Sequence, residues 1–214
     1  RVLSAPGIDA EMPRMVERAG GYWLAYVARG RVEEEPVRGG QAGAKPTGRY
    51  AAEAIEPSRI EIIHLDEEAR PQGEARAVTP LGGHVLAYDL KAVADDGLLI
   101  AWRDDDTPSG SGGGELNVLR IDLSGVGERQ LVVRDDIGAG VPQLVGSWLA
   151  YANRRDELRL AHLDDRGLVG DSPAGPSLFP RAQWLVGRGD DILLAHPRGT
   201  GVEFSLLRCR QLSR

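Results

Sequence analysis

Four polar residues recur at one position of a repeated pattern, and they are the first candidates for chemistry. They are His64, Arg120, His162 and Arg208, each near the end of a run in which apolar and polar residues alternate. If the repeats surround one axis, these side chains could form a polar ring that binds an anion or another small ligand. Two arginines would repel a cation, so the four make a poor metal site. The structural alternative places each side chain at the rim of a sheet, hydrogen-bonded to a neighbouring loop.

Paired aspartates mark many connections between these runs, and the longest group is Asp104, Asp105 and Asp106. Calcium binds carboxylate and carbonyl oxygens of loops, so this group is the best calcium candidate, although its spacing does not match an EF-hand loop. Turn formation is the alternative, because an aspartate side chain bonds nearby backbone N–H groups. The sequence indicates no other cofactor.

No catalytic motif is present in the sequence. There is no Gly-x-Ser-x-Gly elbow, no glycine-rich segment ending in Gly-Lys-Ser/Thr and no His-Glu-x-x-His. The single cysteine, Cys209, excludes an intrachain disulfide and a cysteine-based metal cluster. The sequence therefore favours a non-catalytic protein and leaves an enzyme as the alternative.

The elements that would position these residues form a fourfold repeat. Each repeat has a short apolar phrase: Trp-Leu-Ala-Tyr at 23–26, Leu-Ile-Ala-Trp at 99–102, Trp-Leu-Ala-Tyr at 148–151 and Leu-Leu-Ala-His at 193–196. The alternating runs follow at 60–66, 116–122, 158–164 and 204–210. Such a succession predicts antiparallel strands. Residues 85–94 are the best helix candidate, and a strand competes with it there.

Aligned in this way, the chain divides into four units of four strands each. The units cover residues 13–78, 80–133, 142–172 and 180–212. The last unit has no outer strand, whereas residues 1–4 look like an outer strand with no unit before them. We therefore expect a single domain over residues 1–214, with residues 1–4 completing the last unit.

Four-stranded units that repeat every 40 to 50 residues or so resemble the blades of the β-propeller superfamily. The resemblance covers nearly the whole chain, but it carries no subfamily signature: there is no Gly-His with Trp-Asp, no kelch double glycine and no sialidase-type box. It implies an all-β fold of four-stranded antiparallel blades. The four blades would form either a closed ring or part of a larger propeller.

The composition limits the classes of partner and the cellular locations to be expected. The 214 residues carry a net charge of −6, which argues against a broad nucleic-acid surface. No run of 18 apolar residues could form a membrane helix. Only Lys45 and Lys91 among the 26 basic residues are lysine, a bias typical of GC-rich bacterial genomes. We expect a bacterial protein, in the periplasm or secreted rather than cytoplasmic.

Two insertions interrupt the regular repeat, at residues 29–57 and 107–114. Both fall between the second and third strands of their units, so they should project from one face of adjacent blades, and binding residues concentrate on such loops. The sequence thus predicts a non-catalytic platform for a protein or small-ligand partner. The alternatives are a hydrolase- or lyase-like enzyme or subunit with a polar site at the propeller axis, and a fragment of a larger protein with further blades or domains.

Overall fold

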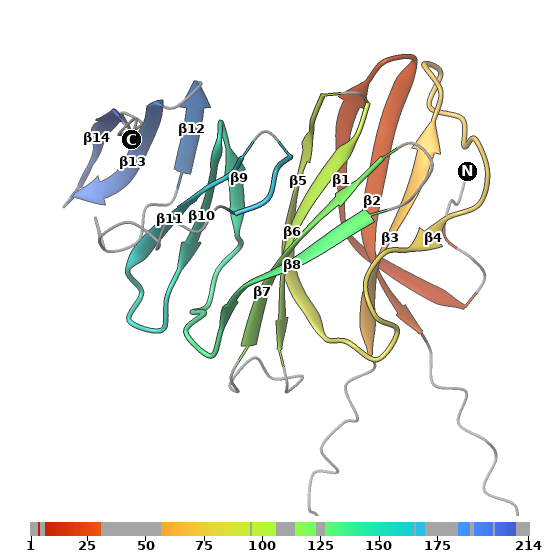
Figure 1. Ribbon diagram of the computed structural model, residues 1–214, viewed down its shortest axis with the longest axis horizontal. Coiled ribbons are helices and arrows are strands. Elements are labelled where there is room, and N and C mark those ends of the chain that lie inside the picture. The colour runs from red at the N-terminus through yellow and green to blue at the C-terminus, as the bar shows by residue number, and fades with distance from the viewer. Residues whose placement is uncertain are drawn as a thin grey trace, which may run out of the picture.

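The computed structural model describes Ser4 and residues 7–30, 57–94, 96–105, 114–122, 127–164, 166–169, 184–188, 191–198 and 200–208. Within these residues the chain is all-β, with fourteen strands and no helix. The strands form four antiparallel sheets that follow one another in chain order across the molecule (Figure 1). In the described part of the chain no helix is long and apolar enough to cross a membrane.

The first two sheets have four strands each, and every strand pairs with the next one along the chain. Sheet 1 consists of β1 (Ile8–Arg18), β2 (Gly21–Gly30), β3 (Ser58–Leu65) and β4 (Arg76–Ala77). Sheet 2 consists of β5 (Val85–Ala92), β6 (Leu98–Asp105), β7 (Gly114–Ile121) and β8 (Gly127–Arg134).

Sheets 3 and 4 each have three described strands. Sheet 3 consists of β9 (Gln143–Val145), β10 (Trp148–Ala152) and β11 (Leu158–His162). Sheet 4 consists of β12 (Trp184–Arg188), β13 (Asp191–Arg198) and β14 (Gly201–Arg208). The segments expected to supply their fourth strands, near residue 172 and at residues 1–3, lie outside the described residues, and Ser4 lies in a bend.

The predicted strand order is confirmed. Each apolar phrase lies on the second strand of its sheet, and each alternating run lies on the third. Residues 85–92, the best helix candidate, form strand β5 instead, because their apolar side chains are buried between two neighbouring sheets. Four antiparallel sheets of three or four strands are what propeller blades require.

Strand β1 begins at Ile8, before residue 13, where the first unit was expected to start. A bulge between Glu11 and Arg14 interrupts its pairing with β2, and Met12 within it has a φ of 49°. Pro13 lies in the same bulge, which suits a residue with no N–H to give to the ladder. The bulge therefore lets pairing continue on both sides of the proline.

The cores lie between successive sheets, and the apolar phrase supplies side chains to both faces of a sheet. In sheet 2, Leu99 and Ala101 pack toward sheet 3, whereas Ile100 and Trp102 pack toward sheet 1. Sheet 3 shows the same alternation: Leu149 and Tyr151 pack toward sheet 2, and Ala150 packs toward sheet 4.

The first strands of the sheets lie side by side, with β1 against β5, β5 against β9 and β9 against β12. These inner strands correspond to the strands that surround the axis of a propeller. Sheet 1 and sheet 4 lie at opposite ends of the row (Figure 1). The described sheets thus form an open, propeller-like arc. Of residues 1–4, which were predicted to close it, residues 1–3 lie outside the described part of the chain, so closure stays a prediction.

Candidate functional site

Three inner strands each place a polar side chain at the same point of the repeat. The residue in question lies directly opposite the alanine of the phrase in its own sheet; the pairs are Arg14–Ala25, Asp89–Ala101 and Gln143–Ala150. Directly opposite side chains in a sheet are close neighbours. The small alanine therefore leaves room beside each long polar side chain.

Asp89 connects the inner strands of three successive sheets. Its Oδ1 accepts a hydrogen bond from Arg14 Nη1 of β1 at 2.9 Å, and its Oδ2 accepts one from the backbone N–H of Leu144 in β9 at 2.8 Å. Burial raises the pKa of Asp89, while the Leu144 N–H and the Arg14 guanidinium act in the opposite direction. The carboxylate is thus partly buried and accepts hydrogen bonds from neighbours on both sides.

Arg14 is held over the ring of Tyr88, with its guanidinium carbon 5.7 Å from the ring centroid. The Tyr88 hydroxyl lies 2.5 Å from the carbonyl oxygen of Met12 and 2.9 Å from that of Ala25. Burial raises the pKa of Tyr88, so the phenol remains a donor at neutral pH. The β1 bulge provides the Met12 carbonyl, and so the bulge positions both the tyrosine and the arginine above it.

A cavity of about 550 Å³ opens beside this polar group. Eleven residues line it: Arg14, Asp89, Ala139, Gly140, Val141, Gln143, Ala150, Tyr151, Ala152, Leu158 and Leu185. They come from the inner strands of all four sheets, from β10 and β11 and from the connection between β8 and β9. The volume lies within the range of about 300–1,000 Å³ that is usual for small-molecule sites.

The connection that forms one wall of the cavity is anchored at two points. The side chain of Ile137 is buried in the core between sheets 2 and 3. The next residue, Gly138, donates its N–H to Ala152 O at 2.8 Å, and a Cβ at Gly138 would lie 2.0 Å from Asn153 O. Only glycine fits this approach, which places residues 139–141 at the mouth of the cavity.

The other described lining residues are apolar or aromatic, with Tyr151 as the largest side chain among them. Burial raises the pKa of Tyr151, so its hydroxyl stays protonated at neutral pH. Among the described residues that line the cavity, Asp89 is the only acid and Arg14 the only base. Because these two charges are paired at 2.9 Å, the cavity offers hydrogen-bond donors and acceptors with little net charge.

The histidines predicted as ligand-binding residues pack against tryptophans. His64 lies opposite Trp23 in the sheet 1 ladder, with ring centroids 3.7 Å apart, and its Nδ1 is 3.1 Å from Arg18 Nη1. His162 lies edge-on to Trp148 at 4.8 Å in sheet 3. Burial lowers the pKa of His64, and the charge of Arg18 adds to the effect.

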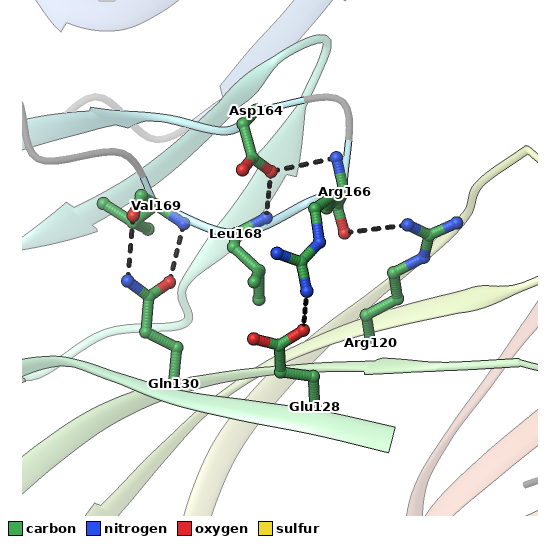
Figure 2. Close-up of polar contacts among 7 residues, drawn as sticks. All are labelled: Arg120, Glu128, Gln130, Asp164, Arg166, Leu168 and Val169. Carbon is green, nitrogen blue, oxygen red and sulfur yellow. Dashed lines mark hydrogen bonds and ion pairs between the residues drawn. The ribbon is translucent and has the colours of Figure 1, made fainter. Parts of the chain in front are cut away.

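Arg120 belongs to a group of polar contacts between sheet 2 and the turn after β11 (Figure 2). It donates to the carbonyl oxygen of Arg166 at 3.4 Å, and Arg166 forms an ion pair with Glu128. Gln130 of β8 bonds the backbone of Val169 twice, receiving its N–H at 2.7 Å and donating to its carbonyl at 2.8 Å. Arg120 therefore connects two sheets at their outer parts.

Arg208 lies opposite Asp191, two residues beyond the equivalent position, which Leu206 occupies opposite Leu193. The contacts of the four predicted residues thus lead to different neighbours, and each lies on the third strand of its sheet rather than on an inner strand. Their role in ligand binding stays a prediction.

Two of the three calcium candidates have described contacts. Asp104 Oδ1 accepts the backbone N–H of His84 at 2.7 Å, and Asp105 Oδ2 pairs with Arg103 Nη2 at 3.0 Å. Asp106 lies outside the described residues, within which no three His, Cys, Asp or Glu side chains come together in a metal-binding group. Calcium binding stays a prediction.

Sequence reasoning missed Arg14, Asp89 and Gln143. A weak signal was present, because Arg14 and Gln143 directly follow prolines, Pro13 and Pro142. Recognising the site also required the pairing register, which places each residue opposite the alanine of its phrase. Binding was predicted at the insertions 29–57 and 107–114, of which residues 31–56 and 107–113 lie outside the described residues.

Comparison with known proteins gives a likeness to solved structures only. No protein-family model matches the chain. No curated protein matches it in sequence. Among solved structures, the chain is similar to an endo-arabinase from Bacteroides thetaiotaomicron VPI-5482, with a TM-score of 0.48 and 14% identity, over 94% of this chain and 75% of that one.

Proposed function

We propose that the chain binds a small, neutral, polar molecule in the cavity at its inner strands. The observation that carries this proposal is the convergence of Arg14, Asp89 and Gln143, from three different sheets, on one cavity of about 550 Å³. Pockets with a few convergent polar groups on a mainly apolar lining are typical small-molecule sites.

The lining favours a ligand with hydroxyl or amide groups and one apolar face. A charged ligand would have to displace Arg14 or Asp89 from its partner, because the two already neutralise each other. A neutral hydroxyl can instead donate to a carboxylate lone pair and accept from a guanidinium N–H without breaking the pair. The ring of Tyr151 offers an apolar surface in the same cavity.

The test is a binding screen with variants of the polar group. Simple sugars, polyols and small amides would be screened by saturation-transfer NMR, and affinities of hits measured by titration calorimetry. Asp89→Asn and Gln143→Ala should each weaken binding about tenfold, the cost of losing a buried hydrogen bond to ligand. Glu17→Gln, a carboxylate-to-amide change at an exposed site on β1, is the matched control. Equal affinity of Asp89→Asn, Gln143→Ala and the control would contradict the proposal.

A second candidate is hydrolysis at the same cavity, and the observation in its favour is the raised pKa of Asp89. A carboxyl group with a raised pKa holds its proton to a higher pH, which favours a role as general acid. Glycoside hydrolysis usually needs two carboxyl groups, and the described lining supplies one. Release of product from any ligand found in the screen, lost in Asp89→Asn, would establish catalysis; an unchanged ligand after prolonged incubation would leave binding alone.

A further inference from the structure

Sheet 4 exposes an apolar face that is built like the buried faces of the other sheets. Five large apolar side chains on it are between 39% and 66% exposed: Val186, Leu193, Val202, Phe204 and Leu206. On the opposite face of the same strands, Ile192 and Leu194 are fully buried in the core shared with sheet 3. Sheet 4 is therefore covered on one side only, as far as the described residues show.

The pairing register shows that the five side chains form one continuous surface. Val186 lies opposite Leu193, and Leu193 lies opposite Leu206. Phe204 and Val202 follow Leu206 at alternate positions of β14, so they point to the same side of the sheet. Contiguous apolar surface of this kind marks an interaction site more often than scattered exposed residues do.

Equivalent positions in the other sheets are all covered by the following sheet. The residue opposite the phrase alanine is Ile62 in sheet 1, Val118 in sheet 2 and Leu160 in sheet 3, and each is at most 3% exposed. In sheet 4 that residue is Phe204, which is 66% exposed. The sequence has kept an apolar side chain at a position where the other three sheets need one for packing.

The direction of stacking identifies the partner. Each of the first three sheets uses this face to bind the sheet that comes next along the chain, through a core of aliphatic side chains from both. Sheet 1 does not return to cover sheet 4, because it lies at the other end of the row (Figure 1).

We propose that the exposed face of sheet 4 is the docking surface for a further antiparallel β-sheet of the same gene product, lying outside residues 1–214. That sheet would present leucine, isoleucine or valine to Phe204 and its neighbours, as sheet 4 presents Ile192 and Leu194 to sheet 3. Near one end of the interface the exposed pair Asp191 and Arg208 calls for polar contacts. The propeller would then extend beyond four blades.

Photo-crosslinking of the native gene product, with p-benzoyl-phenylalanine in place of Phe204, tests this proposal. The residue is exposed, so the replacement should leave folding intact, as circular dichroism would verify. Irradiation should join it to a β-strand segment outside residues 1–214 of the same polypeptide. The same amino acid in place of Met15, which is exposed on sheet 1, is the matched control and should not join that segment.

Every other result would overturn the proposal. A crosslink to residues within 1–214 of a second copy would identify a dimer interface, and one to an unrelated protein would identify a different partner. The absence of any crosslink would show that the face remains in solvent. As an independent measurement on the 214-residue chain, Phe204→Ser with Leu206→Ser should lower the fluorescence of a bound hydrophobic dye at least twofold.

Discussion

Sheets 2 and 4 carry the same strand pattern in different surroundings. Sheet 2 packs on both faces, with Trp102 against sheet 1 and Val118 against sheet 3. Sheet 4 packs on one face through Ile192 and leaves Phe204 exposed on the other. The alternation of apolar residues is the same in both sheets. It therefore indicates that each sheet is suited to pack against a neighbour on both faces, whereas the solvent exposure shows how many faces are covered within the described chain.

The largest expected difference in stability is between substitutions at Ile62 and Phe204, which occupy equivalent positions of sheets 1 and 4. Ile62→Ala should lower the free energy of unfolding by about 2–5 kcal/mol, because it removes a buried side chain between two sheets. Phe204→Ala should change it by less than about 0.5 kcal/mol, because the side chain is exposed. Urea denaturation of both variants of the 214-residue chain measures the difference. Similar losses in the two would show that the exposed face of sheet 4 is covered in solution.

The contact between sheets 3 and 4 can be weakened at Gly187, where the two backbones approach closely. A Cβ at Gly187 of β12 would lie 2.5 Å from Gly146 N and 2.7 Å from Val145 Cγ1. Gly187→Ala should therefore cost about 1–3 kcal/mol, the range for overpacking. Hydrogen exchange should show the loss in β12–β14 before it reaches sheets 1 and 2. Gly82→Ala, where a Cβ meets nothing within 4 Å, is the control, and an equal loss in both would contradict this account.

The hydrogen bonds between sheets 2 and 3 should contribute less to the free energy of unfolding than the close packing at Gly187 does. Gln130→Ala removes both bonds to the backbone of Val169 and should cost about 1–2 kcal/mol. Arg166→Ala breaks only the ion pair with Glu128, in which both side chains are more than half exposed, and should cost less than about 0.5 kcal/mol. Thermal unfolding at matched pH compares the two, and a larger effect of Arg166→Ala would overturn the ranking.

The smallest effect is a dependence on pH at Asp89, which contacts inner strands on both sides of sheet 2. Burial raises its pKa above the ordinary 3.8, so the folded chain keeps this proton at a pH where the unfolded chain has lost it. Stability from this group therefore increases as the pH falls through that window toward 3.8 and is lost as the pH rises. Asp89→Asn should remove this dependence from urea titrations at several pH values, whereas Glu17→Gln should retain it.

The strands could be predicted from the sequence because their signal is local. Alternation at 60–66 and 116–122 needs only neighbouring residues to be seen, and it gave the correct strands and sheets. The candidate site could not be predicted from the sequence, because it depends on which residues face each other across a pair of strands. His64 and Asp89 are both polar residues in strands, and only the register separates a third-strand histidine packed on Trp23 from an inner-strand carboxylate beside a cavity.

The sequence alone did not decide between a closed ring of four blades and part of a larger propeller. Leu193 and Phe204 continue the apolar alternation of the earlier units, and alternation alone carries no information on whether a neighbour is present. The predicted closing strand rested on the pattern of residues 1–4, whereas the position of sheet 1 relative to sheet 4 is a property of the angle between successive sheets. That angle is set by packing over many residues.

The two hydrogen bonds between Gln130 and Val169 have the pattern that a paired β-strand would give to the backbone of Val169. In a β-ladder one peptide group gives an N–H and another a C=O to the same opposing residue, and the Gln130 amide offers both from a single side chain. The backbone of Val169 is thereby closed to any extended segment from another molecule. The amide proton of Val169 should exchange with solvent only when sheets 2 and 3 separate. Its exchange rate therefore measures how often the contact between these two sheets opens.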